Sequence, residues 1–372
     1  MSGKDESVFS KSALMSTKAG KKVMKQGFFK SKGFKQFNQY KEEAEQKFPE
    51  FAKRFTTNLL DQIKSDESAN NTQQQFGEEV GSTEIILNSS EINPIREKLE
   101  NFDILHDRVL RILNSNFVKM TFPVFNALFD ASTNYFDDKD NSSLREDIVD
   151  GHIIAIDLSE PMDRIVDKDE DLDYLDDYKL MNPYILKLAR EKIAKGGDEV
   201  LKQFEMGFKD ARIGQYLDTK LKENPTAITE GELIESYKKY RSVMGTAGRN
   251  MSLSREPLGD IFYIGMAKAA ESVGCGNEIE DTIRDKAVKI PSWPLYHSLS
   301  SKSVQDGFEL TMKQSESYLH EARGAIDSLP EKFSHKEFLE FLFLTVEHYN
   351  EFWYKRLQKE NIWSELSSNL PK

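Results

Sequence analysis

Lysines alternate with bulky apolar residues near the N-terminus. Nine lysines and no acidic residue lie between positions 7 and 41, together with Phe, Met, Leu and Val side chains. Lysines near a bilayer attract anionic headgroups by about 1 kcal/mol each, and aromatic side chains insert at the headgroup boundary. The pattern therefore predicts a segment that binds membranes. Its candidate residues are Lys18, Lys21, Lys22, Lys25, Phe28, Phe29, Lys30, Lys32 and Lys35.

Two other interpretations of this basic segment stay open. It is also typical of a disordered tail without a partner, and interleaved aromatics suit single-stranded nucleic acid. Arginine is absent before Arg54, and lysine combined with large apolar residues favours lipid over nucleic acid. Gly20, Gly27 and Gly33 make an isolated helix unstable in water. We therefore expect an amphipathic helix that a lipid surface induces, and no nucleic-acid partner.

Residues suited to enzymatic chemistry are few. Asp137, Asp138 and Asp140 could hold magnesium and a diphosphate, as aspartate-rich helices do in all-α isoprenoid enzymes, but the Asn-Ser-Ser that follows is typical of a solvated loop. Cys275 is the single cysteine, and no two of the six histidines lie three or four residues apart. The sequence therefore predicts no catalytic residue, metal or cofactor, with a magnesium-dependent isoprenoid-type enzyme as an alternative. The lack of disulfides suits the cytosol.

The charge of the chain is unevenly distributed. Its formal net charge is −12, and residues 130–179 alone contain 17 acids and 5 bases. We expect this stretch to be an acidic insertion whose residues 163–178 form a solvated loop. Within it, residues 151–157 are the one strand-like run, and a short buried loop explains them equally well.

Helical periodicity dominates the rest of the chain. Residues 34–64 carry a helical pattern that Pro49 should interrupt or kink, and the Asn/Gln/Ser-rich residues 65–90 are predicted to be a linker. A helix then follows with apolar residues at alternating spacings of three and four. This heptad pattern is typical of a coiled-coil dimer interface. The predicted seam consists of Ile95, Leu99, Phe102, His106, Val109 and Leu113.

The second half also predicts long helices. A helix that starts near residue 182 should break at Gly196-Gly197, and others are expected over residues 229–249, 257–288, 303–328 and 335–368. Pro291 and Pro294 should break the path between two of them. The fold class is therefore all-α, built from long, kinked, antiparallel helices. No apolar run reaches the roughly 20 residues of a membrane-spanning helix, so any membrane contact should be peripheral and cytoplasmic.

Several motifs in the second half resemble those of BAR and N-BAR proteins. Glu256-Pro257-Leu258-Gly259 resembles the helix start of endophilin-like domains, and Ile290-Pro291 is similar in position to their proline kink. The segment from Glu321 to Asp327 is similar to the end of their middle helix. Residues 76–117 resemble the first-helix region of fungal Golgi-vesicle BAR proteins.

This resemblance implies a fold, an assembly and a function. It implies an elongated BAR-like three-helix coiled coil that forms a homodimer, binds anionic phospholipid and acts in vesicle trafficking or membrane curvature. It also implies that Arg323 contacts lipid. The expected domains are a basic amphipathic segment at 1–64, the linker at 65–90, and a helical domain at 91–369 that contains the acidic insertion.

The main alternative is a soluble helical scaffold without lipid affinity. Its partner would dock on an aromatic stripe of the last helix, although core packing explains such a stripe more simply. The stripe comprises Phe338, Phe341, Phe343, Tyr349, Phe352 and Trp353.

Overall fold

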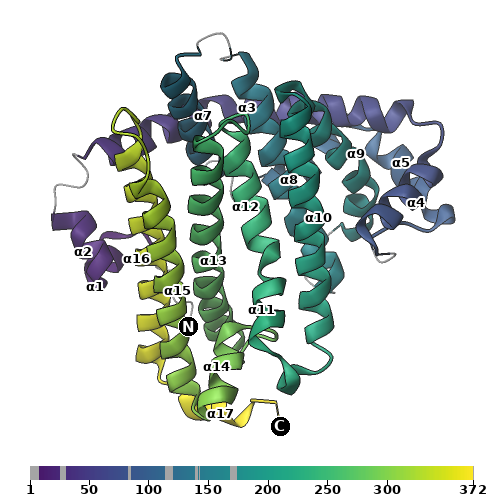
Figure 1. Cartoon of the computed structure of the whole chain (residues 1–372). Helices are drawn as coiled ribbons and strands as arrows, with labels where there is room; N and C mark the ends of the chain where they lie inside the picture. The colour runs from purple at the N-terminus through teal and green to yellow at the C-terminus, as the bar shows by residue number, and fades with distance from the viewer. Residues whose placement is uncertain are drawn as a thin grey trace. The chain divides into compact units, whose positions relative to one another are not determined.

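The computed structural model describes residues 8–25, 31–82, 85–113, 120–138, 141, 143–167 and 174–371. Over these ranges the chain forms 17 α-helices and no β-strand, which confirms the all-α prediction (Figure 1). The chain divides into two compact units. Unit 1 comprises residues 1–36 and 205–372, and unit 2 comprises residues 37–204.

Unit 2 is built from seven helices within the described ranges, of which the first begins in unit 1. They are α3 (Lys32–Ser65), α4 (Ala69–Val80), α5 (Ser89–Leu99), α6 (Phe102–Leu113), α7 (Phe122–Phe136), α8 (Leu144–Asp167) and α9 (Leu175–Ile193). A short 3-10 turn at Ala194–Gly196 follows, and Gly197 takes a positive φ of 99°. The predicted break at Gly196-Gly197 is therefore confirmed.

Helix α8 lies in the interior of unit 2, packed against both α7 and α9. Gly151 lets α8 approach α9 closely, because a β-carbon at this position would lie 3.1 Å from the Ala189 carbonyl oxygen of α9. Ile153 and Ile154 are fully buried. The strand-like run at 151–157 is thus a helix, and both interpretations of it were wrong. A helix buried on several sides shows a continuous apolar run without a visible period.

Two other predictions for this half need correction. The predicted linker contains α4, whose Gln73 donates hydrogen bonds to the main-chain carbonyls of Lys179 and Leu180, each at 3.2 Å. Phe76 of the same helix is buried. In addition, the expected acidic loop is partly helical, because α8 continues to Asp167 and α9 begins at Leu175. Residues 168–173 lie outside the described ranges.

Unit 1 contains two short N-terminal helices and the helices of the C-terminal half. They are α1 (Lys11–Ser16), α2 (Lys18–Lys25), α10 (Asp198–Leu221, which begins in unit 2), α11 (Glu230–Ser236), α12 (Lys238–Asn250), α13 (Leu258–Asp285), α14 (Trp293–Ser301), α15 (Val304–Asp327), α16 (Lys336–Glu360) and α17 (Trp363–Ser368). A 3-10 turn lies at Pro225–Ala227. The four predicted helices are confirmed, two of them as closely spaced pairs.

Helix α13 is the centre of unit 1 and packs against α12, α15 and α16 (Figure 1). Trp293, Phe308, Phe338 and Phe343 are fully buried around it. A helix with three long neighbours differs from one in a three-helix coiled coil, where each helix has two. The BAR-like arrangement and the elongated shape stay predictions.

Serines set the starts of the last helices in unit 1. The Ser292 hydroxyl accepts from the Leu295 N–H at 3.1 Å, and the Ser303 hydroxyl accepts from the Asp306 N–H at 3.2 Å. Side-chain oxygens at this position satisfy N–H groups that the first helical turn leaves without a partner. Helix α13 ends at Asp285 and α14 begins at Trp293, with Pro291 between them, so the predicted break between helices is confirmed.

Candidate membrane-binding surface

The basic N-terminal segment forms two helices that dock on α16. Ser10 caps α1 by accepting from the Ala13 N–H at 3.2 Å. Helix α2 is capped from outside, because the Glu351 carboxylate of α16 accepts from the N–H groups of Lys18 (2.6 Å) and Ala19 (3.2 Å). A carboxylate at a helix N-terminus also interacts favourably with the helix dipole. These helices therefore form through tertiary contacts, not only on a lipid surface.

His348 of α16 holds the segment at a second point. Its Nε2 lies 2.8 Å from the Val8 carbonyl oxygen, and its Nδ1 lies 2.7 Å from the Thr17 hydroxyl. Because a carbonyl only accepts, these partners assign the proton to Nε2, and Nδ1 accepts from Thr17. The ring is fully buried, and this burial lowers the pKa of His348 below its ordinary value. The neutral ring therefore suits the docked segment.

The apolar residues of the two helices face the protein. Ala13, Leu14, Ala19 and Val23 are buried against it. The predicted amphipathic face exists, but packing within unit 1 occupies it. Among the described residues of this segment, Phe9 (52% exposed) and Met15 (43% exposed) are the large apolar side chains that remain on the surface.

Most of the predicted lysines face solvent. Lys18, Lys21, Lys22 and, at the start of α3, Lys32 and Lys35 are exposed. Among the described residues, the one ion pair that involves these five lysines is long, because Lys22 Nζ lies 3.9 Å from the Glu347 carboxylate. The side chain of Lys25 and all of Phe28, Phe29 and Lys30 lie outside the described residues. The described part therefore carries five solvated cations.

The start of α3, which carries Lys32 and Lys35, also packs against α16. Gly33 lies directly against α16, since a β-carbon there would be 2.2 Å from the Glu337 carbonyl oxygen. The rings of Phe34 and Phe341 meet edge to face at 6.0 Å. These contacts lie within unit 1 and leave both lysines outward.

Arg323 shares the carboxylate of Glu347 with Lys22 of α2. It is half-buried on α15 and pairs with Glu347 of α16. An arginine committed to an internal ion pair has little capacity left for a headgroup, so this part of the predicted site is not supported by its surroundings.

The predicted coiled-coil seam is divided between two helices. The helix is interrupted at Asn101, between α5 and α6. The Asn101 side chain accepts a hydrogen bond from the N–H of Asp103 at 3.0 Å and so caps the start of α6. Leu99, Val109 and Leu113 are fully buried inside unit 2, so they are not available to a second copy. Ile95, Phe102 and His106 are half-buried, and His106 bonds to the Thr56 hydroxyl at 2.8 Å.

The residues considered for enzymatic chemistry are not assembled into a site. Asp137 follows the end of α7 in a left-handed conformation, and Asp140 lies outside the described residues. Cys275 is buried, and burial raises the pKa of its thiol well above the ordinary value. Over the described ranges, no group of three or more His, Cys, Asp or Glu side chains is placed to hold a metal ion.

Most of the aromatic stripe on α16 belongs to the core. Phe338, Phe341, Phe343 and Phe352 are buried. Tyr349 is half-buried and donates a hydrogen bond to the Asn277 side chain at 2.6 Å. These four phenylalanines cannot dock a partner without unfolding unit 1, which favours the core-packing interpretation.

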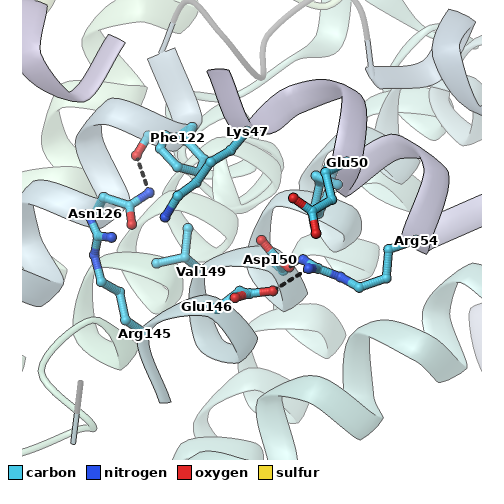
Figure 2. Close-up of a pocket in the computed structure, with 10 residues that line it drawn as sticks. Lys47, Glu50, Arg54, Phe122, Asn126, Arg145, Glu146, Val149 and Asp150 are labelled. Carbon is cyan, nitrogen blue, oxygen red and sulfur yellow. Dashed lines mark hydrogen bonds and ion pairs between the residues drawn. The ribbon is translucent and has the colours of Figure 1, made fainter. Parts of the chain in front are cut away.

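Sequence reasoning missed a polar pocket in unit 2, with a cavity of about 120 Å³ (Figure 2). Arg54 reaches Glu146 at 2.5 Å and Asp150 at 2.8 Å, and Lys47 reaches Glu43 at 2.8 Å. The full lining is Lys47, Glu50, Phe51, Arg54, Phe122, Asn126, Arg145, Glu146, Val149 and Asp150. A volume of this order holds a few waters.

Ion pairs occupy the cations of this pocket. Arg145 bonds to Glu43 and to Asp130, both at 2.8 Å. Its guanidinium holds the pKa of Glu43 at about 2, whereas burial raises the pKa of Asp150 to about 6. Because every lining cation already has a carboxylate partner, the pocket is a structural network and not a free anion site. In the sequence, the sign of this pocket was the spacing of Glu43, Lys47 and Arg54, which places the three charged residues on one face of a helix.

No family model matches the chain, and no curated protein matches it significantly. Across the described ranges, none of the helices combines the length and apolar composition needed to cross a bilayer.

Proposed function

We propose that the protein binds anionic membranes peripherally through its N-terminal segment. The observation that carries this proposal is the exposure of Lys18, Lys21, Lys22, Lys32 and Lys35 in a stretch with no acid between positions 7 and 41. At about 1 kcal/mol for each lysine near an anionic surface, five lysines provide several kcal/mol at low salt.

Two features support lipid as the anionic partner. Phe9 and Met15 are exposed beside the lysines, and side chains of this kind insert at the headgroup boundary. The remaining apolar residues of α1 and α2 are buried against the protein, so binding of the docked segment is mainly electrostatic. Such binding weakens as salt screens the charges.

The proposal extends to vesicle membranes and their curvature through assembly. One segment binds weakly, and two segments on one particle bind with higher avidity without any new contact. This is the arrangement that the BAR resemblance implies. A soluble scaffold, by contrast, would not bind lipid at all.

Cosedimentation with vesicles tests the proposal. The full chain should pellet with vesicles of phosphatidylcholine and phosphatidylserine, and much less with phosphatidylcholine alone. Replacing Lys18, Lys21 and Lys22 by Gln removes about 3 kcal/mol of attraction and should weaken binding by roughly 100-fold at low salt.

A matched triple variant controls for the loss of net charge. Lys313, Lys332 and Lys359 are exposed lysines elsewhere in unit 1, and their replacement by Gln should leave binding nearly unchanged. Equal pelleting of the wild type and the α2 variant on anionic vesicles would overturn the proposal, as would equal binding to neutral and anionic vesicles.

A further inference from the structure

One face of α16 makes the polar contacts that hold α1 and α2 on unit 1. Its four residues share one side of the helix, because they are spaced by one, three and four positions. Each of them contacts the N-terminal segment through an ion pair or a hydrogen bond. This docking face consists of Glu347, His348, Glu351 and Lys355.

The docking face binds the main chain at the corner between α1 and α2. Lys355 Nζ donates a hydrogen bond to the Ser16 carbonyl oxygen at 2.8 Å, where α1 ends. The Glu351 carboxylate accepts from the N–H groups of Lys18 and Ala19, where α2 begins. A cation at a helix C-terminus and an anion at a helix N-terminus both interact favourably with the helix dipole. The corner is therefore held without any contribution from a lysine side chain of the segment.

Burial of apolar area contributes less to this docking. Among the described residues of α1 and α2, the buried apolar side chains are Ala13, Leu14, Ala19 and Val23, and two of these are alanines. The free energy of burial grows with the apolar area removed from water, so the alanines add little. An environment that covers Leu14 and Val23 equally well can therefore compete with α16.

A lipid surface is such an environment, because the lysines and the buried apolar residues of α2 lie on different faces. Ala19 and Val23 are buried in the docked helix. Lys18, Lys21 and Lys22 are exposed, so lipid that binds them leaves the apolar face covered by protein. An amphipathic helix in a bilayer interface instead buries its apolar face while its lysines extend to the headgroups. Lipid thus contacts one face of the docked helix and both faces of the undocked helix, and such a difference in affinity favours undocking.

We propose that the docking face of α16 restrains the N-terminal segment until an anionic membrane displaces it, after which Leu14 and Val23 insert at the boundary of the acyl chains. This regulation rests on the proposed function, because the exposed lysines first bring the docked protein to the membrane. Binding then has two stages. The docked stage is sensitive to salt, whereas the inserted stage is held by apolar burial and resists salt.

Two substitutions release the segment in different ways. Glu351→Ala removes the carboxylate that caps α2. Gly20→Ala places a β-carbon 2.1 Å from the Leu14 carbonyl oxygen and leaves the charge of the chain unchanged. Glu340→Ala is the matched control for charge, because Glu340 is an exposed acid of α16 outside the docking face.

Hydrogen exchange of the α2 amides in the full chain, without lipid, measures the release. It should be about tenfold faster in Glu351→Ala, which is the order expected for loss of a hydrogen bond to a charged group. Gly20→Ala should also exchange faster, and Glu340→Ala should match the wild type. Thermal melting of each variant separates release of the segment from unfolding of the protein.

Cosedimentation with vesicles of phosphatidylcholine and phosphatidylserine measures insertion, at low salt and in about 0.5 M NaCl, where exposed charges are screened over a few Å. Both release variants should pellet more than the wild type and keep binding at high salt, whereas Glu340→Ala should behave like the wild type. Adding Leu14→Ser and Val23→Ser to Gly20→Ala should abolish the binding that resists salt.

Several results would overturn the restraint by α16. Unchanged α2 exchange in Glu351→Ala is one, and faster exchange without tighter vesicle binding is another. Binding at high salt that survives the Leu14 and Val23 substitutions is a third, and a gain of binding that Glu340→Ala reproduces is a fourth. Failure of the proposed function is seen separately, since it leaves low-salt binding of the wild type unaffected by loss of the α2 lysines.

Discussion

Acidification should release the N-terminal segment from α16, because His348 is docked in its neutral form. The buried ring has a pKa below its ordinary value, whereas the exposed ring of the undocked state returns to about 6.5. Above about pH 6.5 the ring is neutral in both states, and docking is fully favourable. As the pH falls below that value, only the undocked state takes up the proton, so docking weakens until the pH reaches the lower pKa of the docked state.

The magnitude follows from the proton count. One proton distinguishes the two states, so the docking equilibrium constant should fall by at most tenfold, or about 1.4 kcal/mol, for each pH unit. Glu351 and Lys355 of α16 also face the ring, and Lys22 of α2 and Arg323 of α15 both reach Glu347 beside it.

Hydrogen exchange of the α2 amides measures this equilibrium between about pH 7.5 and about pH 5.5, after correction for the intrinsic exchange rate. The wild type should lose protection as the pH falls. His348→Gln is the matched variant, because its amide can donate to Val8 and accept from Thr17 but does not titrate. Its protection should vary little with pH. Identical pH dependence in the two proteins would refute the role of His348, as would constant protection in the wild type.

Three further outcomes follow from buried groups. Burial raises the pKa of Glu278 to about 8, so stability should fall as the pH rises from about 4.5 to about 8, and Glu278→Gln should raise the melting temperature at pH 8 but hardly at pH 5. Arg145→Leu leaves Glu43 without its strongest partner inside unit 2 and should destabilise by roughly 3 kcal/mol in urea unfolding. Gly20→Ala places a β-carbon 2.1 Å from the Leu14 carbonyl oxygen, so it should undock α1 and α2 and increase their hydrogen exchange at neutral pH.

The later helices were predictable because local residues set their ends. Pro291 breaks the path before α14, and Ser303 caps α15, so the signals lie within a few residues of each boundary. The run at 151–157 lacked such a signal, since its helix is buried on several sides. Helix α4 was hidden by its polar composition, because Gln73 is buried through hydrogen bonds to carbonyls more than a hundred residues away. Composition alone cannot reveal such a partner.

The candidate site was predictable in its residues but not in its conformation. Lysine has no reason to be buried in an acid-free stretch, and the five predicted membrane-binding lysines whose side chains are described are all exposed, as the pattern indicates. The docking of α1 and α2 depends on Glu351 and His348, which lie more than three hundred residues further along the chain. No periodicity within the basic segment could identify them.

Net charge is a poor guide to the partner of this protein, because its charges are not equally available. Within the acidic stretch, Asp177 is buried and bonds to Lys98 at 2.6 Å and to Arg108 at 2.8 Å, and Asp147 bonds to Lys192 at 3.0 Å. Carboxylates paired inside unit 2 have much of their field cancelled at close range. Among the described side chains of α2, Lys18 and Lys21 have no comparable partner and Lys22 has only a long contact with Glu347, so their field persists at the surface. A chain with a net charge of −12 can therefore present a basic surface, and membrane attraction should follow that surface and not the total.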